Sequence, residues 1–94
     1  MSTRKIEVEL FSAQASSPVI RVSGRQYPGV LLPGDSLHVL SGLVQEAEDG
    51  LLNRDEAKSR EAIAELKDLL TGYAAAYEAT LAASGLSLPH LRPQ

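Results

Sequence analysis

Ser36 has the clearest potential for chemistry, because it stands in the run Gly34–Leu37 with an acidic neighbour before it and a histidine shortly after it. A nucleophilic serine needs a general base within hydrogen-bonding reach, a group that orients this base, and donors for the oxyanion. His38 is the nearest base, but residues two apart on a helix do not face each other. His90 is the other histidine. Ser36 and His38 alone therefore do not predict a catalytic pair.

The run Gly34–Leu37 spells the GDSL signature and resembles the esterases named after it. That resemblance covers four residues, and it implies an aspartate three residues before a C-terminal histidine. This chain has Ser87 at that distance from His90. A structural interpretation explains the same letters: glycine in a turn, Asp35 or Ser36 as a helix N-cap, and Leu37 as the first core residue. We therefore expect no enzyme, and a GDSL-like esterase remains an alternative.

A second group of polar residues flanks the third predicted strand and the start of the first predicted helix. An arginine near the free amides of a helix N-terminus is a possible site for a small anion. A capping carboxylate from Asp35 would occupy the place of such an anion. The candidate ligand-binding residues are Arg25, Tyr27, Asp35, Ser36 and His38.

Composition excludes several classes of protein. The 94 residues contain no cysteine and two histidines, so we expect no metal site and no cofactor. The net charge is −3, and basic residues are outnumbered in both halves of the chain, which argues against nucleic acid as a partner. The start of the chain alternates where a signal peptide needs a continuous apolar stretch, and no apolar run is long enough for a bilayer. We expect a cytoplasmic protein without membrane contact.

Three short strands are predicted in the first third of the chain. Ile6, Val8 and Leu10 alternate with charged residues, which is typical of a half-buried strand over about residues 5–11 with its apolar side inward. A second strand is expected over 18–23 and a third over 27–32. Pro28 has no amide hydrogen, so the third strand should lie at an edge or begin after this proline.

Two helices should follow, over about residues 36–49 and 53–84, with a tail over 85–94. Gly50 suits the left-handed residue that ends the first helix, and Asn53 suits the start of the second. We expect the second helix to continue through Gly72, with this glycine at a contact, and to stop at Gly85.

Charge is almost absent from the last part of the second helix, since residues 71–84 contain only Glu78. A helix that is small and apolar nearly all round is usually buried on more than one side, and the second side could be another subunit. The strands and the first helix of the same chain could equally cover it. The candidate interface residues are Tyr73, Ala76, Tyr77, Thr80 and Leu81.

Four segments of the chain form a recognisable pattern: Ile6–Phe11 with its E-x-E-L-F pattern, Val19–Val22, the G-R-x-[FY]-P-G-V segment of Gly24–Val30, and the G-D-S cap in Gly34–Leu37. With this pattern the chain resembles a family of small, functionally uncharacterised bacterial proteins. The resemblance implies a bacterial origin and a stand-alone domain, and it implies no activity. Pro33 stands where the family pattern has glutamine.

We predict a single α+β domain over residues 1–94, with three short, mostly antiparallel strands followed by two helices packed on one sheet face, the second helix long. The expected function is a non-catalytic protein–protein interaction module, homodimeric through the second helix. An immunity-type or other protein that binds a different protein is the alternative, and a small-anion binder is a further one.

Overall fold

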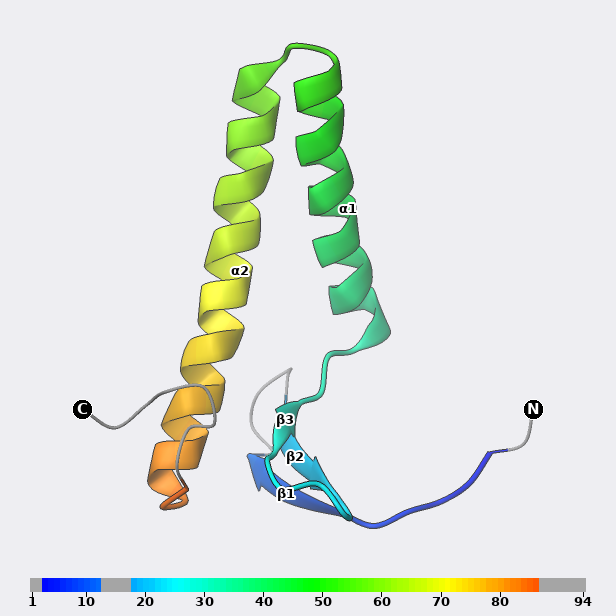
Figure 1. Cartoon of the computed structure of the whole chain (residues 1–94), viewed down its shortest axis with the longest axis vertical. Helices are drawn as coiled ribbons and strands as arrows, with labels where there is room; N and C mark the ends of the chain where they lie inside the picture. The colour runs from blue at the N-terminus through cyan, green and yellow to red at the C-terminus, as the bar shows by residue number, and fades with distance from the viewer. Residues whose placement is uncertain (1–2, 13–17, 87–94) are drawn as a thin grey trace. The chain divides into compact units, whose positions relative to one another are not determined.

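Three strands and then two helices follow one another along the chain (Figure 1), which confirms the predicted α+β class. The computed structural model describes residues 3–12 and 18–86. The predicted tail from residue 87 onward, with His90, lies outside these residues. The elements are β1 (Val8–Ser12), β2 (Val19–Val22), β3 (Gly29–Val30), α1 (Gly34–Leu52) and α2 (Glu56–Ala83).

The chain forms two compact units. The sheet unit comprises residues 1–31 and 76–94, and the hairpin unit comprises residues 32–75. The helix α2 is continuous through Gly72, as predicted, and contributes residues to both units.

The sheet is antiparallel, with the order β1-β2-β3. Val8 pairs with Val22 and Leu10 with Ile20, and a β-bulge follows because Ser12 is the next residue of β1 to pair. The strand β3 begins directly after Pro28 and pairs only with β2, so the predicted edge position is confirmed. All three strands are shorter than predicted. The sequence pattern that predicts a strand continues beyond the residues that pair with a neighbouring strand.

The predicted inner face of the first strand is wrong. Ile6, Val8 and Leu10 are exposed, whereas Val19, on the opposite face of the sheet, is buried. Arg21 shares the Val19 face, because the two residues are two apart on one strand. Alternation separates the two faces of a strand, but it does not tell which face meets the core.

The last turns of α2 belong to the sheet unit. The Tyr77 hydroxyl donates a hydrogen bond of 3.0 Å to the carbonyl oxygen of Pro28, and Leu81 is fully buried. The helix ends as predicted at Gly85, which has a φ of 73°. The Leu86 amide donates to the carbonyl of Leu81, and the Gly85 amide donates to that of Ala82, which is the Schellman arrangement.

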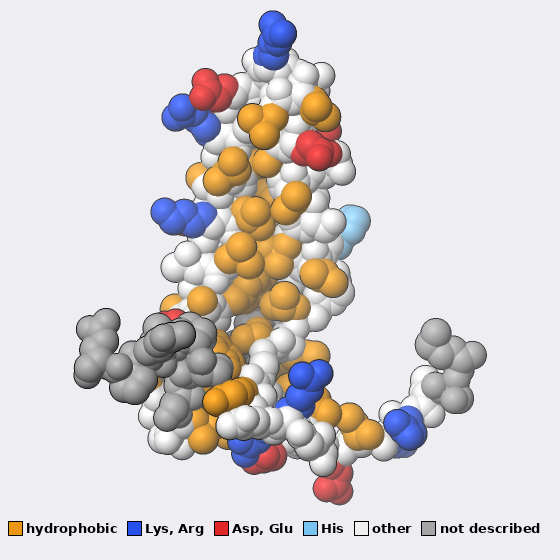
Figure 2. All heavy atoms as spheres, in the orientation of Figure 1, with side chains coloured by type: hydrophobic (Ala, Val, Ile, Leu, Met, Phe, Trp, Pro, Cys, Tyr) orange, Lys and Arg blue, Asp and Glu red, His pale blue; other side chains and the backbone are white. Residues whose placement is uncertain are grey.

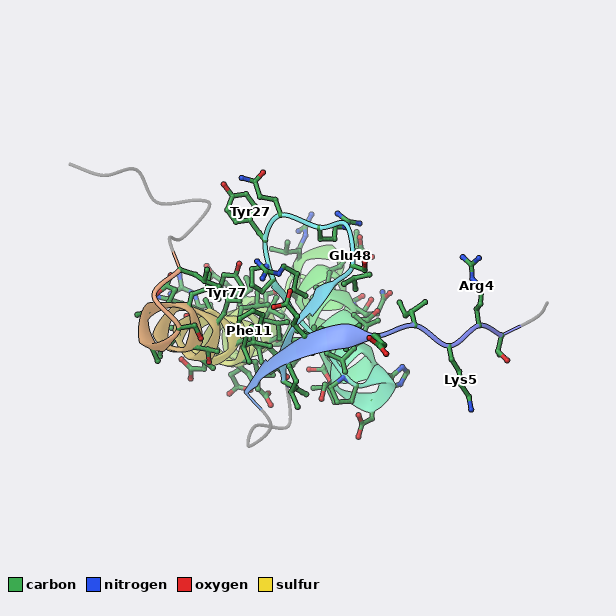
Figure 3. The ribbon with its side chains drawn as sticks, turned by 90° about the horizontal axis from the view of Figure 1, so that it is seen from below. Arg4, Lys5, Phe11, Tyr27, Glu48 and Tyr77 are labelled. Carbon is green, nitrogen blue, oxygen red and sulfur yellow. The ribbon has the colours of Figure 1, made fainter. Side chains whose placement is uncertain are left out.

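The hairpin unit consists of α1 and the adjoining part of α2, which run antiparallel side by side (Figures 1 and 3). The helix α1 starts two residues before the predicted position, with Pro33 as N-cap and no side-chain cap. The predicted N-cap role of Asp35 or Ser36 is therefore wrong. Asp35 lies inside the first turn instead, where its carboxylate accepts a hydrogen bond of 2.9 Å from the Ser36 amide.

The turn between the helices also differs from the prediction. The helix α1 continues through Gly50, and Asn53 forms its C-cap by donating its backbone and side-chain amides to the Asp49 carbonyl. Asp55 takes the start role predicted for Asn53, since its carboxylate accepts a 3.2 Å hydrogen bond from the Lys58 amide. Arg54 between them has a φ of 57°. An asparagine followed by acidic residues suits both the end of one helix and the start of the next. The residue types alone therefore did not decide which of these two roles Asn53 has.

Gly50 is buried for a reason other than helix termination. A Cβ at this position would meet the side chain of Ser59, and it would lie 2.8 Å from the carbonyl oxygen of Asp55. The Ser59 hydroxyl donates a 2.7 Å hydrogen bond to the Ala47 carbonyl. Gly50 therefore permits the close approach of α1 to the start of α2. The close contact predicted for Gly72 is wrong, since a Cβ there would meet nothing within 4 Å among the described residues.

Candidate functional site

Two of the five predicted ligand-binding residues line one cavity in the sheet unit. Arg25 and Tyr27 lie in the turn between β2 and β3, and Figure 3 shows Tyr27 on this turn. The Arg25 amide closes the turn by donating to the Val22 carbonyl at 3.0 Å, and Gly24 supplies a φ of 88°. The cavity has a volume of about 310 Å³ and is lined by Ile20, Val22, Arg25, Tyr27, Pro28, Gly29, Val30 and Leu31.

The other three predicted ligand-binding residues belong to the hairpin unit. Asp35 and Ser36 form the first turn of α1, and the Asp35 carboxylate already accepts a hydrogen bond from an amide there. His38 is exposed. Residues two apart on an α-helix are turned by about 200°, so Ser36 and His38 do not form a nucleophile and base. The hydroxyl, carboxylate and imidazole of this turn thus give no catalytic arrangement.

An ion pair that sequence reasoning missed lies on the Val19 face of the sheet. Arg21 donates from Nε to Glu9 Oε1 at 2.8 Å and from Nη2 to Glu9 Oε2 at 3.0 Å. Its guanidinium lies 5.5 Å from the centre of the Phe11 ring. The hydrogen bonds from Arg21 hold the pKa of the exposed Glu9 carboxyl below its ordinary value. The signal in the sequence is that Glu9 and Arg21 face each other once the β1 and β2 register is known.

The predicted interface residues of α2 are partly occupied within the chain. Leu81 is fully buried, and Tyr77 is half-buried with its hydroxyl on Pro28. The Thr80 hydroxyl donates to the Ala76 carbonyl of its own helix at 2.8 Å. Tyr73 is half-buried and belongs to the hairpin unit. The charge-poor segment is thus covered in part by its own chain, which was the other possibility that the sequence left open.

A larger apolar surface lies on the hairpin unit. We call it the hairpin face, and it consists of Leu37, Val44 and Leu51 on α1 with Ile63 and Leu70 on α2. These five side chains are between 49% and 68% exposed. Figure 2 shows hydrophobic side chains gathered along the two helices on this side. The sequence predicted Leu37 to be a core residue, because the spacing of apolar residues predicts a helix face without telling what covers it.

The five residues share one side of the hairpin for a geometric reason. On each helix the exposed residues are spaced by seven, so they form one stripe along the helix. A second, buried stripe contacts the other helix, and it includes Leu40 and Leu43 on α1 and Ala62 on α2. On both helices the exposed stripe is rotated away from the buried stripe in the same sense, the sense in which the chain winds. Because the two helices run in opposite directions, a rotation in the same sense along each chain places both exposed stripes on the same side of the hairpin. Both exposed stripes therefore border one continuous apolar surface.

The size of the hairpin face is in the range of functional surfaces. The fourteen residue steps from Leu37 to Leu51 span about 21 Å, and two helices side by side are about 20 Å wide. The hairpin face therefore lies within a footprint of about 400 Å². Exposed apolar patches of about 300 to 600 Å² on a single chain are often functional.

The described residues give no sign of two other kinds of site. Among residues 3–12 and 18–86, no group of three His, Asp or Glu side chains is arranged to hold a metal ion. No helix in this part of the chain combines the length and apolarity that a bilayer span requires.

The fold and its surfaces define a small α+β protein with a three-stranded antiparallel sheet and an apolar helical hairpin. The chain belongs to the family of unknown function DUF6959, whose model matches residues 3–90. Neither a curated protein nor a solved structure matches it.

Proposed function

We propose that this protein is a non-catalytic protein–protein interaction module that forms a homodimer through its hairpin face. The observation that carries the proposal is the row of five half-exposed aliphatic side chains at heptad spacing. Heptad spacing is the pattern by which helices pack against other helices at small crossing angles. A second hairpin of the same kind would complete a four-helix bundle. The proposal keeps α2 in the interface, but through Ile63 and Leu70 rather than through Leu81.

The energetics favour a partner on this face. Burying a fully exposed Val, Leu or Ile side chain contributes roughly 1.5 to 3 kcal/mol. The five half-exposed residues of each copy would then contribute on the order of 10 kcal/mol to a symmetric dimer. Association costs about 4 to 15 kcal/mol in lost freedom of motion, so this gain exceeds the cost only in the lower part of that range, and the dimer should dissociate on dilution.

A charge observation favours a second candidate, in which the partner is a different protein. The helix α1 has no Lys or Arg, and the hairpin unit has four basic and nine acidic residues. A basic amphipathic helix would match both the apolar face and this negative charge. Such a partner would give the immunity-type or other hetero-protein-binding function. Because charge attraction is screened by salt, its binding should weaken strongly at high ionic strength, whereas the homodimer should strengthen.

Two valines of α1 provide a matched test of the homodimer. Val44 lies on the hairpin face and Val39 lies on the other side of α1, and both are about half exposed. We expect Val44→Gln to weaken the dimer at least tenfold, and Val39→Gln to leave the dimer unchanged. The measurement is the molar mass by light scattering at several concentrations, with circular dichroism to show that helix content is retained. Equal effects of the two substitutions would contradict the proposed interface.

A further inference from the structure

A cavity lies between the β2–β3 turn and the face of the sheet that carries Ile20 and Val22. It combines apolar walls with the cationic side chain of Arg25. Its walls come from Ile20, Val22, Val30 and Leu31. Among residues 3–12 and 18–86, Arg25 is the only charged residue that lines it, and no acidic residue does. Val22 and Leu31 are exposed, so their apolar surface is open to a ligand. The volume of about 310 Å³ is near the lower end of the usual range for ligand sites, about 300 to 1,000 Å³.

The guanidinium of Arg25 is free to bind an anion. Arg21 forms an ion pair with Glu9, and Arg60 forms one with Glu56. Among the residues that the structure describes, the Arg25 side chain has neither a hydrogen bond nor an ion pair, and only its backbone amide is engaged. An arginine presents a planar set of donors that matches the two oxygens of a carboxylate.

We propose that this cavity binds a small apolar monocarboxylate, with the carboxylate on Arg25 and the hydrocarbon part against Val22, Val30 and Leu31. Tyr27 lines the same cavity. A larger polyanion such as nucleic acid would need several cations, and the described part of the chain supplies one here, Arg25. A peptide added to the sheet would need a longer edge than β3, which has two residues.

The test compares two ligands of the same shape that differ in charge. The first is 3-phenylpropionate, and the second is its neutral amide, 3-phenylpropionamide. Each is titrated into the full chain at neutral pH while backbone amide signals are followed by NMR. We expect the carboxylate to bind in the millimolar range, to shift the signals of Val22, Arg25 and Val30, and to bind about tenfold more tightly than the amide.

Two arginine variants locate the charge effect. Arg25→Gln should abolish the preference for the carboxylate over the amide, whereas Arg4→Gln, at another exposed arginine of the sheet unit, should retain it. Unchanged amide signals outside the turn show that both variants are folded. Equal binding of the two ligands by the unsubstituted chain, no binding by either, or a preserved preference in Arg25→Gln would each overturn the proposal. The site lies in the sheet unit, so its test does not depend on the hairpin face.

Discussion

Gly50 of α1 and Ser59 of α2 lie so close together that the chain has no room for a Cβ at position 50. The Ser59 hydroxyl donates to the Ala47 carbonyl, one turn before Gly50, at 2.7 Å. Both residues are buried, in a hairpin unit with few other buried side chains. This contact therefore sets how closely the two helices approach at the turn.

The first prediction concerns this contact. Gly50→Ala should lower the free energy of unfolding by about 1 to 3 kcal/mol, because the added methyl group must displace backbone atoms. Gly42→Ala is the control, since Gly42 lies in α1 with nothing within 4 Å of a Cβ, and it should raise stability by roughly 0.5 to 1 kcal/mol. Urea denaturation followed by circular dichroism measures both.

A double substitution distinguishes the two parts of the clash. Adding Ser59→Ala to Gly50→Ala removes the hydroxyl but leaves the Asp55 carbonyl oxygen and the Ser59 backbone nitrogen each 2.8 Å from the new Cβ. We therefore expect no recovery of stability in the double variant. Full recovery would show that the side chain alone, and not the backbone, excludes a Cβ.

The second prediction concerns the hydrogen bond between Tyr77 and Pro28. Tyr77→Phe should destabilise the sheet unit by about 1 to 3 kcal/mol, since it removes the hydroxyl that donates to the carbonyl of the buried Pro28. Tyr73→Phe is the control at a half-buried tyrosine of the same helix, and it should cost less. Hydrogen exchange of the β2 and β3 amides should increase in the first variant only.

The third prediction tests whether Gly72 has a structural role. Gly72 is exposed inside α2 with open space around its Cα, so Gly72→Ala should stabilise the helix by up to about 1 kcal/mol. Thermal denaturation gives the change. A loss of stability or of dimer mass would instead indicate that another backbone approaches this glycine.

The fourth prediction follows from the lowered pKa of Glu9. Because the folded-state pKa lies below the unfolded one, the pair with Arg21 stabilises the protein above the unfolded pKa, about 4.3 for glutamate. This stabilisation is lost as the pH falls through the lowered pKa of Glu9 in the folded chain. Arg21→Gln should return the pKa of Glu9 to its ordinary value in an NMR titration. Arg25→Gln should leave it lowered, because the guanidinium that pairs with Glu9 belongs to Arg21.

Local signals in the sequence predicted those parts of the fold that depend on backbone chemistry. Pro28 predicted where β3 begins, because proline has no amide hydrogen to donate within a sheet. Gly85 predicted the end of α2, because glycine readily adopts the positive φ that ends a helix. Gly50 suggested the same kind of helix stop, but its role depends on Ser59 in the other helix. A residue pair separated along the chain leaves no local trace, so the sequence alone could not reveal this contact.

The candidate sites were predictable to a different extent. Arg25 and Tyr27 lie in one short turn, so their closeness in the structure followed from their closeness in the sequence, whereas the cavity that they line did not. The hairpin face did not follow, since Leu37 and Ile63 have the same helical spacing as core residues and differ from Leu40 only in what covers them. Burial is a property of the assembled structure, and periodicity reports only the side of the helix.

The proposed dimer is tested most directly by the molar mass of the unsubstituted chain in solution, measured by light scattering over a wide dilution series. We predict a mass of twice 10.0 kDa at high concentration, which falls toward the single-chain value on dilution and is held up by added salt. A mass of 10.0 kDa at every concentration and salt level would contradict the homodimer.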